Sequence, residues 1–469
     1  MKAMSFELAL LVFAGMALAT PLSRAACVYY TDQPAGAAGS VFSLAPDGSA
    51  QQLIVTVAGA PDLRGIAWHR ASGRVFVLDN GPAKRIFSIR PDGTGLQSVV
   101  GLGTSVLYAD LEIDEVSGKM YWADANPGSS GNGFVYRANL DGSGVEPIVT
   151  TPPGVTTAPY FLFLDPRDGF IYWGVTSSGN GPSSFRRATF TGALDSDFLL
   201  TTATRTRDLA VDPTTPTVYW CDRQSGALFK RAVAGGVSEV VLSGLNAPHG
   251  LALDVEAGKL YWADTGGRGS GPFNTSARRI ARCNLDGTEF ENLSVPAANS
   301  EPWDLALDVS SPTYADWRMR FFSVATPQAG PTDDADGDGA PNLLEYALAT
   351  HPRRDSDVPL LTLEGAALRF TRRLEAQINY HVEVSMDLET WHFNGDNTAL
   401  VWTSEESPTP LGSELESARV VAGPALSGAL PVFFRVRVVA GAGAGGMTST
   451  LRAQNLSRPA ARPVEVGME

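Results

Sequence analysis

The sequence predicts an all-β protein whose larger part is a six-bladed β-propeller, and an internal repeat is the main reason. An aromatic pair followed two residues later by an acid recurs, as in Tyr121-Trp122-Ala123-Asp124 and Tyr261-Trp262-Ala263-Asp264. The copies, some degenerate, start at residues 29, 76, 121, 172, 219 and 261, so neighbours are 47, 45, 51, 47 and 42 residues apart. This period is typical of a four-stranded propeller blade. The 48 glycines and 31 prolines fit a chain with many turns.

Composition and charge limit the class of protein. At 469 residues the chain is long enough for two or three domains. The net charge of −14, with no cluster of Lys and Arg, argues against nucleic acid as a partner. Residues 1–25 read as an export signal, because the apolar run 8–19 is too short to span a bilayer and ends in Ala17-Leu18-Ala19. No later stretch suits a membrane helix, so we expect a secreted, extracellular or periplasmic monomer.

Each repeat has the same order of elements. An alternating strand that ends in an acid comes first, as in Leu209-Ala210-Val211-Asp212 and Leu251-Ala252-Leu253-Asp254. A glycine turn, the aromatic strand and a third strand follow, and Asp-Gly pairs such as Asp92-Gly93 make the next hairpin turn. Three cysteines fit neither a metal spacing nor a redox pair, and we expect small buried residues at Cys27, Cys221 and Cys283.

The repeated motifs resemble the YWTD repeats, or class B repeats, of the low-density lipoprotein receptor family. The resemblance covers residues 27–310, and it implies that the aromatic and acidic residues of the motif are structural. The ends of this region also suggest how the ring closes. The chain enters at a second strand, whereas Trp303 to Asp308 is a first strand with no aromatic copy after it. Joining the two completes a sixth, split blade and removes the free sheet edges.

One face of the predicted propeller is a candidate binding surface. The loops that follow the second strands, residues 125–133, 175–184 and 265–277, are long and rich in Gly, Ser and Asn. Aligning the six first strands predicts which residues surround the axial mouth and which form the next ring inward. The mouth holds Arg64, Ala109, Tyr160, Arg207, His249 and Trp303, and the inner ring holds Gly65, Asp110, Phe161, Asp208, Gly250 and Asp304.

Two interpretations of this ring remain open. Trp, Tyr, Arg and His dominate the energetic centres of interfaces, which favours a site for an extracellular protein or glycan. The ligand-binding candidates are then Arg64, Asp110, Tyr160, Arg207, Asp208, His249, Trp303 and Asp304. Alternatively, the same side chains only plug the mouth and pair with one another.

Catalysis is the less favoured alternative. Some six-bladed propellers hydrolyse lactones with an axial calcium ion, but this mouth lacks the Glu and Asn such a site needs. His69 and His249 are isolated, and no nucleophile motif accompanies them. No catalytic residue is therefore predicted.

The sharpest chemical motif lies in the next segment, residues 315–356. Asp334, Asp336, Asp338, Asn342 and Glu345 occupy positions one, three, five, nine and twelve of an EF-hand loop. Gly339 supplies the turn at position six, and Ala340 offers its carbonyl at position seven. The pattern predicts a Ca²⁺ site in which Asn342 acts through water. Because Pro341 occupies position eight, the loop resembles single, dockerin-like segments rather than paired EF-hands. Similar segments end in Gly-Thr-Asp-Pro, whereas this one ends in Ala349-Thr350-His351-Pro352, which argues against a second-site ligand at His351.

The remaining chain predicts a small antiparallel β-sandwich over residues 358–440, followed by a disordered tail over 441–469. Alternating runs at 368–371, 380–384, 418–421 and 433–439 supply its strands, with Trp391 after a turn. This arrangement is similar to the C-terminal modules of many secreted bacterial proteins.

These features together favour a non-enzymatic recognition protein of the bacterial cell exterior, stabilised by calcium. A structural envelope component and a calcium-dependent, lactonase-like hydrolase are the alternatives.

Overall fold

The computed structural model describes residues 27–452 with gaps, and residues 1–26 and 453–469 lie outside it. The predicted export signal and most of the predicted disordered tail therefore fall outside the described residues. So do the central parts of the three long loops. The gaps are residues 35–37, 104–106, 116, 126–132, 152–157, 167, 177–182, 197, 203–204, 267–277, 295–299, 310–313, 323–326, 356, 358, 365–366, 375–377, 395–399, 412–414, 427–431 and 441–447.

The first part of the chain is a β-propeller made of four-stranded antiparallel sheets. Five of these sheets use four consecutive strands, in which an alternating first strand leads and the aromatic strand is second. The strands of these five sheets are β4 (Leu63–His69), β5 (Arg74–Asp79), β6 (Arg85–Ile89) and β7 (Gln97–Gly101); β8 (Tyr108–Asp114), β9 (Lys119–Asp124), β10 (Phe134–Asn139) and β11 (Glu146–Thr150); β12 (Phe161–Asp165), β13 (Phe170–Thr176), β14 (Ser183–Thr189) and β15 (Leu200–Thr201); β16 (Thr206–Asp212), β17 (Thr217–Asp222), β18 (Ala227–Ala232) and β19 (Glu239–Ser243); and β20 (Pro248–Asp254), β21 (Lys259–Asp264), β22 (Arg279–Asn284) and β23 (Glu291–Ser294).

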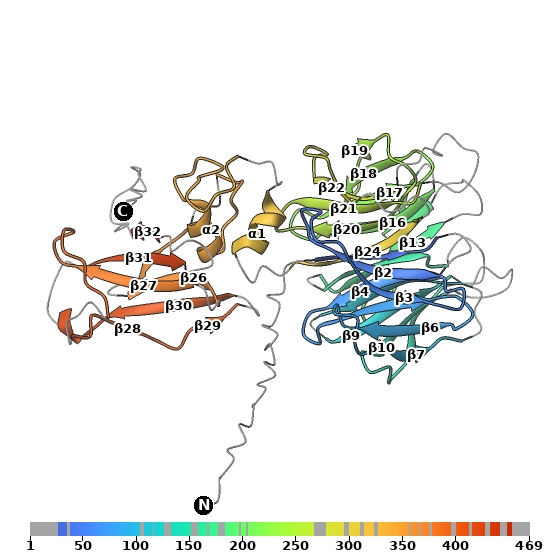
Figure 1. Ribbon diagram of the computed structural model, residues 1–469, viewed down its shortest axis with the longest axis horizontal. Coiled ribbons are helices and arrows are strands. Elements are labelled where there is room, and N and C mark those ends of the chain that lie inside the picture. Colours follow the sequence, from blue (N-terminus) through green and yellow to red (C-terminus); the bar gives the residue numbers. More distant parts are fainter. Residues whose placement is uncertain are drawn as a thin grey trace, which may run out of the picture.

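A further sheet joins the two ends of this region. Strand β24 (Pro302–Asp308) pairs antiparallel with β1 (Cys27–Asp32), which continues into β2 (Gly39–Leu44) and β3 (Gln52–Val57). The first strands β4, β8, β12, β16, β20 and β24 contact one another in that order, and β24 contacts β4 again. The strands at the two ends of the region therefore lie in one sheet of a cyclic arrangement (Figure 1).

The repeated aromatic residues pack between neighbouring sheets. Tyr121 lies in one hydrophobic cluster with Trp173 of the following sheet, whereas its neighbour Trp122 packs with Phe76 of the preceding sheet. All of these rings are almost fully buried, because radially arranged sheets leave large gaps that only bulky side chains fill. The motif acid tightens the adjoining turn, as where Asp222 accepts hydrogen bonds from the backbone N–H groups of Gln224 and Ser225. Cys221 and Cys283 are buried in another such cluster, as expected, whereas Cys27 at the start of β1 is partly exposed, so the prediction that it is buried was wrong.

A second unit follows the propeller, and α1 and α2 lie between the propeller and the C-terminal sheets (Figure 1). Helix α1 is Tyr314–Phe321 and α2 is Asn342–Leu348. One sheet has the order β25 (Thr362–Glu364), β26 (Ala367–Arg373), β30 (Leu415–Ala422) and β28 (Thr403–Glu405), with β29 (Thr409–Pro410) also on β30. The other has the order β27 (Ile378–Ser385), β31 (Phe433–Ala440) and β32 (Thr448–Arg452), and a 3-10 turn occupies Pro424–Leu426.

The C-terminal unit differs from the prediction at one point. The four predicted runs lie within β26, β27, β30 and β31. Strand β32, however, falls inside the segment that was predicted to be disordered, and it pairs with β31 from Val439↔Thr448 to Arg435↔Arg452. The Gly- and Ala-rich run 441–447 just before it made the whole segment look unstructured, whereas the strand itself contains two threonines, which favour strands, and pairs with β31.

Candidate functional site

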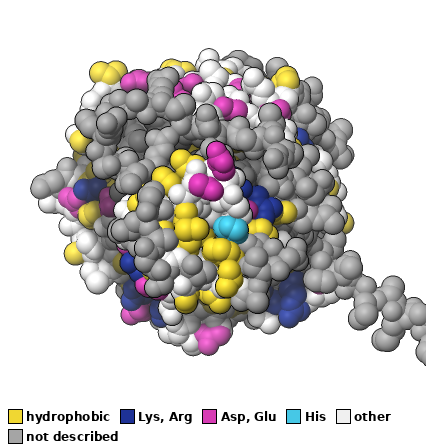
Figure 2. All heavy atoms as spheres, turned by 90° about the vertical axis from the view of Figure 1, so that its left-hand side faces the viewer, with side chains coloured by type: hydrophobic (Ala, Val, Ile, Leu, Met, Phe, Trp, Pro, Cys, Tyr) yellow, Lys and Arg dark blue, Asp and Glu magenta, His cyan; other side chains and the backbone are white. Residues whose placement is uncertain are grey.

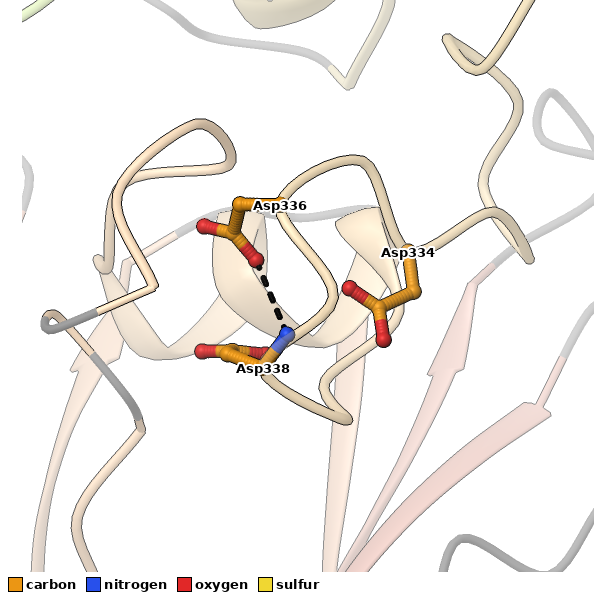
Figure 3. A group of neighbouring side chains, drawn as sticks. All are labelled: Asp334, Asp336 and Asp338. Carbon is orange, nitrogen blue, oxygen red and sulfur yellow. Dashed lines mark hydrogen bonds between the residues drawn. The ribbon is translucent and has the colours of Figure 1, made fainter.

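The predicted calcium loop brings its three aspartates together. One carboxylate oxygen from each of Asp334, Asp336 and Asp338 lies within 4.8 Å of the others (Figure 3). The loop is held by its own acids, because Asp334 accepts hydrogen bonds from the N–H groups of Gly337 at 2.8 Å and Gly339 at 2.9 Å. Gly339 has a φ of 96°, which favours glycine. The predicted role of this residue in the turn therefore has a structural basis.

Glu345 approaches the same place from helix α2. Its side chain is fully buried, and neither carboxylate oxygen has a hydrogen-bond partner among the described residues. Burial raises the pKa of Glu345 to about 9, and the negative charges of Asp336, Asp338 and Asp334 add to that rise. Burial and the neighbouring acids also raise the pKa of Asp338 to about 6. Such a group of desolvated acids is stabilised by a cation.

The other two predicted ligand positions have different surroundings. Ala340 is buried, and its N–H donates to Asp338 at 2.6 Å. The amide nitrogen of Asn342 donates to the carbonyl oxygens of Gln328 at 2.9 Å and Gly330 at 2.8 Å. Asn342 therefore ties the preceding segment to the start of α2, and its amide oxygen is the atom left for a cation or a bridging water.

One acid near the loop was missed in the sequence. The charge of Asp357 contributes to the raised pKa values of both Glu345 and Asp338, so this carboxylate lies close to the cluster. Asp357 falls outside the twelve-residue pattern, and no spacing rule points to it. His351, in contrast, accepts a hydrogen bond from the N–H of Arg353 at 3.0 Å and stacks edge-on against Phe321. Its burial lowers its pKa to about 3, in keeping with a structural residue.

The predicted axial mouth is assembled at one end of the propeller axis. All six predicted mouth residues and five members of the next ring line one small cavity of about 10 Å³. The rings of His249 and Trp303 lie 3.9 Å apart, and the guanidinium of Arg64 sits 4.7 Å from the centroid of Trp303. The guanidinium of Arg207 lies 5.6 Å from the ring of Tyr160. Because these side chains pack on one another, they close the mouth.

We define the mouth cluster as Arg64, Tyr160, Arg207, His249 and Trp303. Its members differ in how far they are buried. Arg207, His249 and Trp303 are buried, whereas Arg64 and Tyr160 keep some exposed surface. Burial, together with the nearby charges of Arg207, Arg223 and Arg64, holds the pKa of His249 well below its ordinary value.

The three aspartates of the inner ring clamp neighbouring sheets together. Each carboxylate accepts one hydrogen bond from the N–H that follows it and another from the first strand of the next sheet. The inter-sheet bonds run from Leu162 to Asp110 at 2.6 Å, from Leu251 to Asp208 at 2.7 Å and from Ile66 to Asp304 at 3.0 Å. Gly65 and Gly250 occupy intervening positions, where a Cβ would lie 2.5 Å from the backbone of Leu111 and 2.7 Å from that of Asp304.

His69, the other histidine considered as a site residue, has a structural role in a turn. His69 shares a hydrogen bond of 2.8 Å with the hydroxyl of Ser72 in the turn after β4. Within the described part of the chain, the calcium-loop aspartates are the one group of three acidic, His or Cys side chains close enough to hold a metal. On the side of the molecule formed by the C-terminal sheets, the described Lys and Arg lie at several separate places rather than in one patch (Figure 2). Neither described helix is long and apolar enough to cross a membrane.

The chain is similar to receptor-related proteins in part of its length. No family model matches it. A Pyricularia oryzae protein named low-density lipoprotein receptor-related protein 1 is 28% identical over 267 residues, which cover 49% of this chain and 83% of that protein. The human low-density lipoprotein receptor-related protein 5-like protein is 28% identical over 151 residues, 32% of this chain and 55% of the human one. The match therefore spans about half of that human relative.

Solved structures with a similar arrangement are more distant in sequence. A chain of a nidogen/laminin complex aligns with a TM-score of 0.49 and 14% identity, over 61% of this chain and all of that one. Regucalcin from Agrobacterium tumefaciens, described as a calcium-binding protein, aligns with a TM-score of 0.36 and 15% identity, over 52% of this chain and 77% of its own.

Proposed function

We propose that this protein is a secreted or cell-surface recognition protein, with no catalytic role, that binds an extracellular protein or glycan through the loop face of its propeller. The propeller has six blades and closes through the composite sheet of β24 and β1–β3. The observation that carries the proposal is the mouth cluster, in which Arg, Trp, His and Tyr side chains converge at the centre of one face. The similarity to proteins named as lipoprotein receptor-related supports a binding role.

The mouth cluster acts as a rigid centre for recognition. Aromatic rings stacked with guanidinium groups lose little side-chain entropy on binding, which suits an energetic centre of an interface. Arg64 and Tyr160 make the direct contacts, and the buried Trp303 holds the Arg64 guanidinium in place. The long loops that the sequence predicts over residues 125–133, 175–184 and 265–277 would select the partner.

The calcium loop stabilises the segment between the propeller and the sandwich. Asp334, Asp336, Asp338 and Glu345 supply carboxylate oxygens, Ala340 a carbonyl, and Asn342 a water-mediated contact. Hard oxygen ligands in this number suit Ca²⁺. The supporting observation is the pair of buried, unpartnered oxygens of Glu345 beside three converging aspartates.

The hydrogen bonds made by the acids on the propeller axis support a non-enzymatic role. Both oxygens of Asp110, Asp208 and Asp304 already accept backbone hydrogen bonds, and their side chains do not converge as a metal site within the described residues. The described histidines of the mouth and of the β4 turn are engaged in packing and turn bonds.

Capture of partners from culture supernatant tests the recognition role. The Arg64→Ala/Tyr160→Ala double variant should lose captured partners while its thermal midpoint stays close to that of the wild type. Lys230→Ala/Leu53→Ala, on the third strand of one sheet and the fourth strand of another, is the matched control and should capture them normally. Unchanged capture by the mouth variant, or capture lost only together with thermal stability, would contradict a recognition role and leave the cluster as a plug.

Calorimetric titration of the full chain tests the calcium site. The wild type should bind Ca²⁺, and saturation at about 100 times Kd should add about 2.7 kcal/mol to its free energy of unfolding. Glu345→Gln should lose most of the affinity, because it removes the bidentate carboxylate, whereas Asp355→Asn in the following turn should behave as the wild type. Absence of binding at millimolar Ca²⁺ would rule out the site.

A further inference from the structure

A large cavity lies on the propeller axis, on the far side of the inner-ring aspartates from the mouth cluster. Its volume is about 820 Å³, which falls in the range of pockets that hold small molecules. The side chains of Arg70, Glu115 and Val309, beyond the ends of β4, β8 and β24, also line it. The cavity therefore extends to the C-terminal ends of the first strands, and Asp110, Asp208 and Asp304 lie at its inner end.

The register of the first strands explains why this space exists. In each sheet the residue that pairs with the first aromatic of the repeat occupies an equivalent position, two residues after the inner ring. Four of these six positions hold alanine, and the other two hold Glu112 and Phe163. The pairs are Ala67↔Phe76, Glu112↔Tyr121, Phe163↔Tyr172, Ala210↔Tyr219, Ala252↔Tyr261 and Ala306↔Tyr29. Small side chains at most positions leave the axis unfilled at this level.

We call these six equivalent positions the alanine ring. Glu112 is the one charged residue among them. No hydrogen bond or ion pair joins it to another residue of the described chain, in contrast to the inner-ring aspartates, whose oxygens accept backbone N–H groups. Burial, and then the negative charges of Asp110 and Asp304, raise its pKa well above the ordinary value. Glu112 is partly exposed and lines the cavity, so its carboxyl group, which has no protein partner, is accessible there to a ligand that completes its hydrogen bonds.

The walls define what kind of ligand fits. Phe163, Leu253, Leu305 and Leu307 offer apolar surface around the carboxyl group. A metal ion does not suit the cavity, because Glu112 is its single uncommitted carboxylate and Ca²⁺ requires six to eight oxygen ligands. An ammonium group suits it, because its N–H groups donate to a carboxylate and the acidic inner ring lowers the energy of a cation.

We propose that this axial cavity binds a small organic cation, with an ammonium group paired to Glu112 and an apolar body against Phe163 and the leucines. The site is separate from the mouth cluster, because the packed side chains of that cluster and the clamp aspartates lie between them. A test can therefore contradict ligand binding in the cavity without contradicting partner recognition at the mouth cluster, and the reverse.

Calorimetric titration of the full chain with phenethylammonium, and with neutral 2-phenylethanol as its isostere, tests the proposal. The wild type should bind phenethylammonium at least about tenfold tighter, since a charged hydrogen bond contributes about 1.5–3 kcal/mol. Glu112→Gln should abolish that preference, and Glu115→Gln at the cavity opening should keep it. Absence of saturable binding at millimolar phenethylammonium, or an equal loss of preference in both variants, would overturn the proposal.

A second variant tests the same cavity without touching the charge. Ala252→Leu places three more carbons at an alanine-ring position and should abolish binding of both probes while Ca²⁺ binding persists. This variant decides the question if Glu112→Gln does not fold. Wild-type affinity of Ala252→Leu for phenethylammonium would contradict the axial location. Partner capture through the mouth cluster should be unchanged in either variant.

Discussion

At the scale of single residues, acids of the same type have different tasks because their oxygens have different partners. Asp208 uses its two oxygens to join two sheets, through the N–H groups of Leu209 and Leu251. Asp338 has one oxygen bonded to the N–H of Ala340 and one buried without a partner. The first arrangement is complete without a ligand, and the second is not. This difference separates scaffold acids from candidate ligands more clearly than residue type does.

Replacing a clamp aspartate should weaken the propeller. In Asp208→Asn one carboxylate oxygen becomes an NH₂ group that faces a buried backbone N–H, and we expect a loss of about 1–3 kcal/mol. Urea denaturation followed by tryptophan fluorescence measures it. Asp92→Asn is the matched control, because one oxygen of Asp92 already accepts both bonds from Thr94 and asparagine retains that oxygen. Equal midpoints for the two variants would contradict the clamp role.

At the scale of elements, helix α1 joins the second unit to the propeller. Arg320 on α1 donates to both oxygens of Asp254 at the end of β20, at 2.8 and 2.7 Å, and both side chains are buried. The propeller residue Ala257 packs in the same hydrophobic cluster as Trp317 and Phe321. The junction is therefore a buried ion pair surrounded by aromatic rings, adjacent to the segment that carries the calcium loop.

Breaking this junction should cost far more than breaking a surface pair. Arg320→Ala leaves Asp254 buried and uncompensated, which costs about 3–5 kcal/mol. Arg353→Ala removes a more exposed pair with Glu289 and should cost at most about 1 kcal/mol. Calorimetric unfolding of the full chain compares them. A similar effect of both substitutions would show that the buried pair does not hold the junction.

The sequence predicts the elements of this protein better than their contacts. The in-register repeats locate the first and second strands, because each unit carries the same pattern of apolar and aromatic residues. The pairing of Arg320 with Asp254 is not predictable, since it depends on where a helix 66 residues away along the chain comes to lie. Glu112 stands at a position that holds alanine in four of the six aligned first strands, so the sequence already marked this residue as unusual. Its meaning required the three-dimensional arrangement of the first strands, in which Ala67, Ala252 and Ala306 line the same cavity as Glu112.

At the scale of the whole molecule, the pairing of β24 with β1 links the stability of the sheets at the two ends of the propeller region. Strand β24 pairs with β1 from Cys27↔Asp308 to Asp32↔Pro302, so the strands at the two ends of the propeller region depend on each other. Leu305 of β24 packs with Tyr261 and Ile280 of the neighbouring sheet. In a closed ring every sheet has two neighbours, and loss of one sheet exposes edges and cores on both sides. Unfolding is then expected to involve all sheets at once.

Leu305→Ala tests this cooperativity. The substitution removes buried side-chain volume from the closing sheet and should cost about 2–5 kcal/mol. Amide hydrogen exchange followed by mass spectrometry then compares β24 with β16 and β17. In a closed ring, protection falls by the same factor in all three strands, because their exchange requires opening of the whole propeller. Loss of protection confined to β24 and β1 would instead mean that the composite sheet opens alone and that closure does not couple the ring.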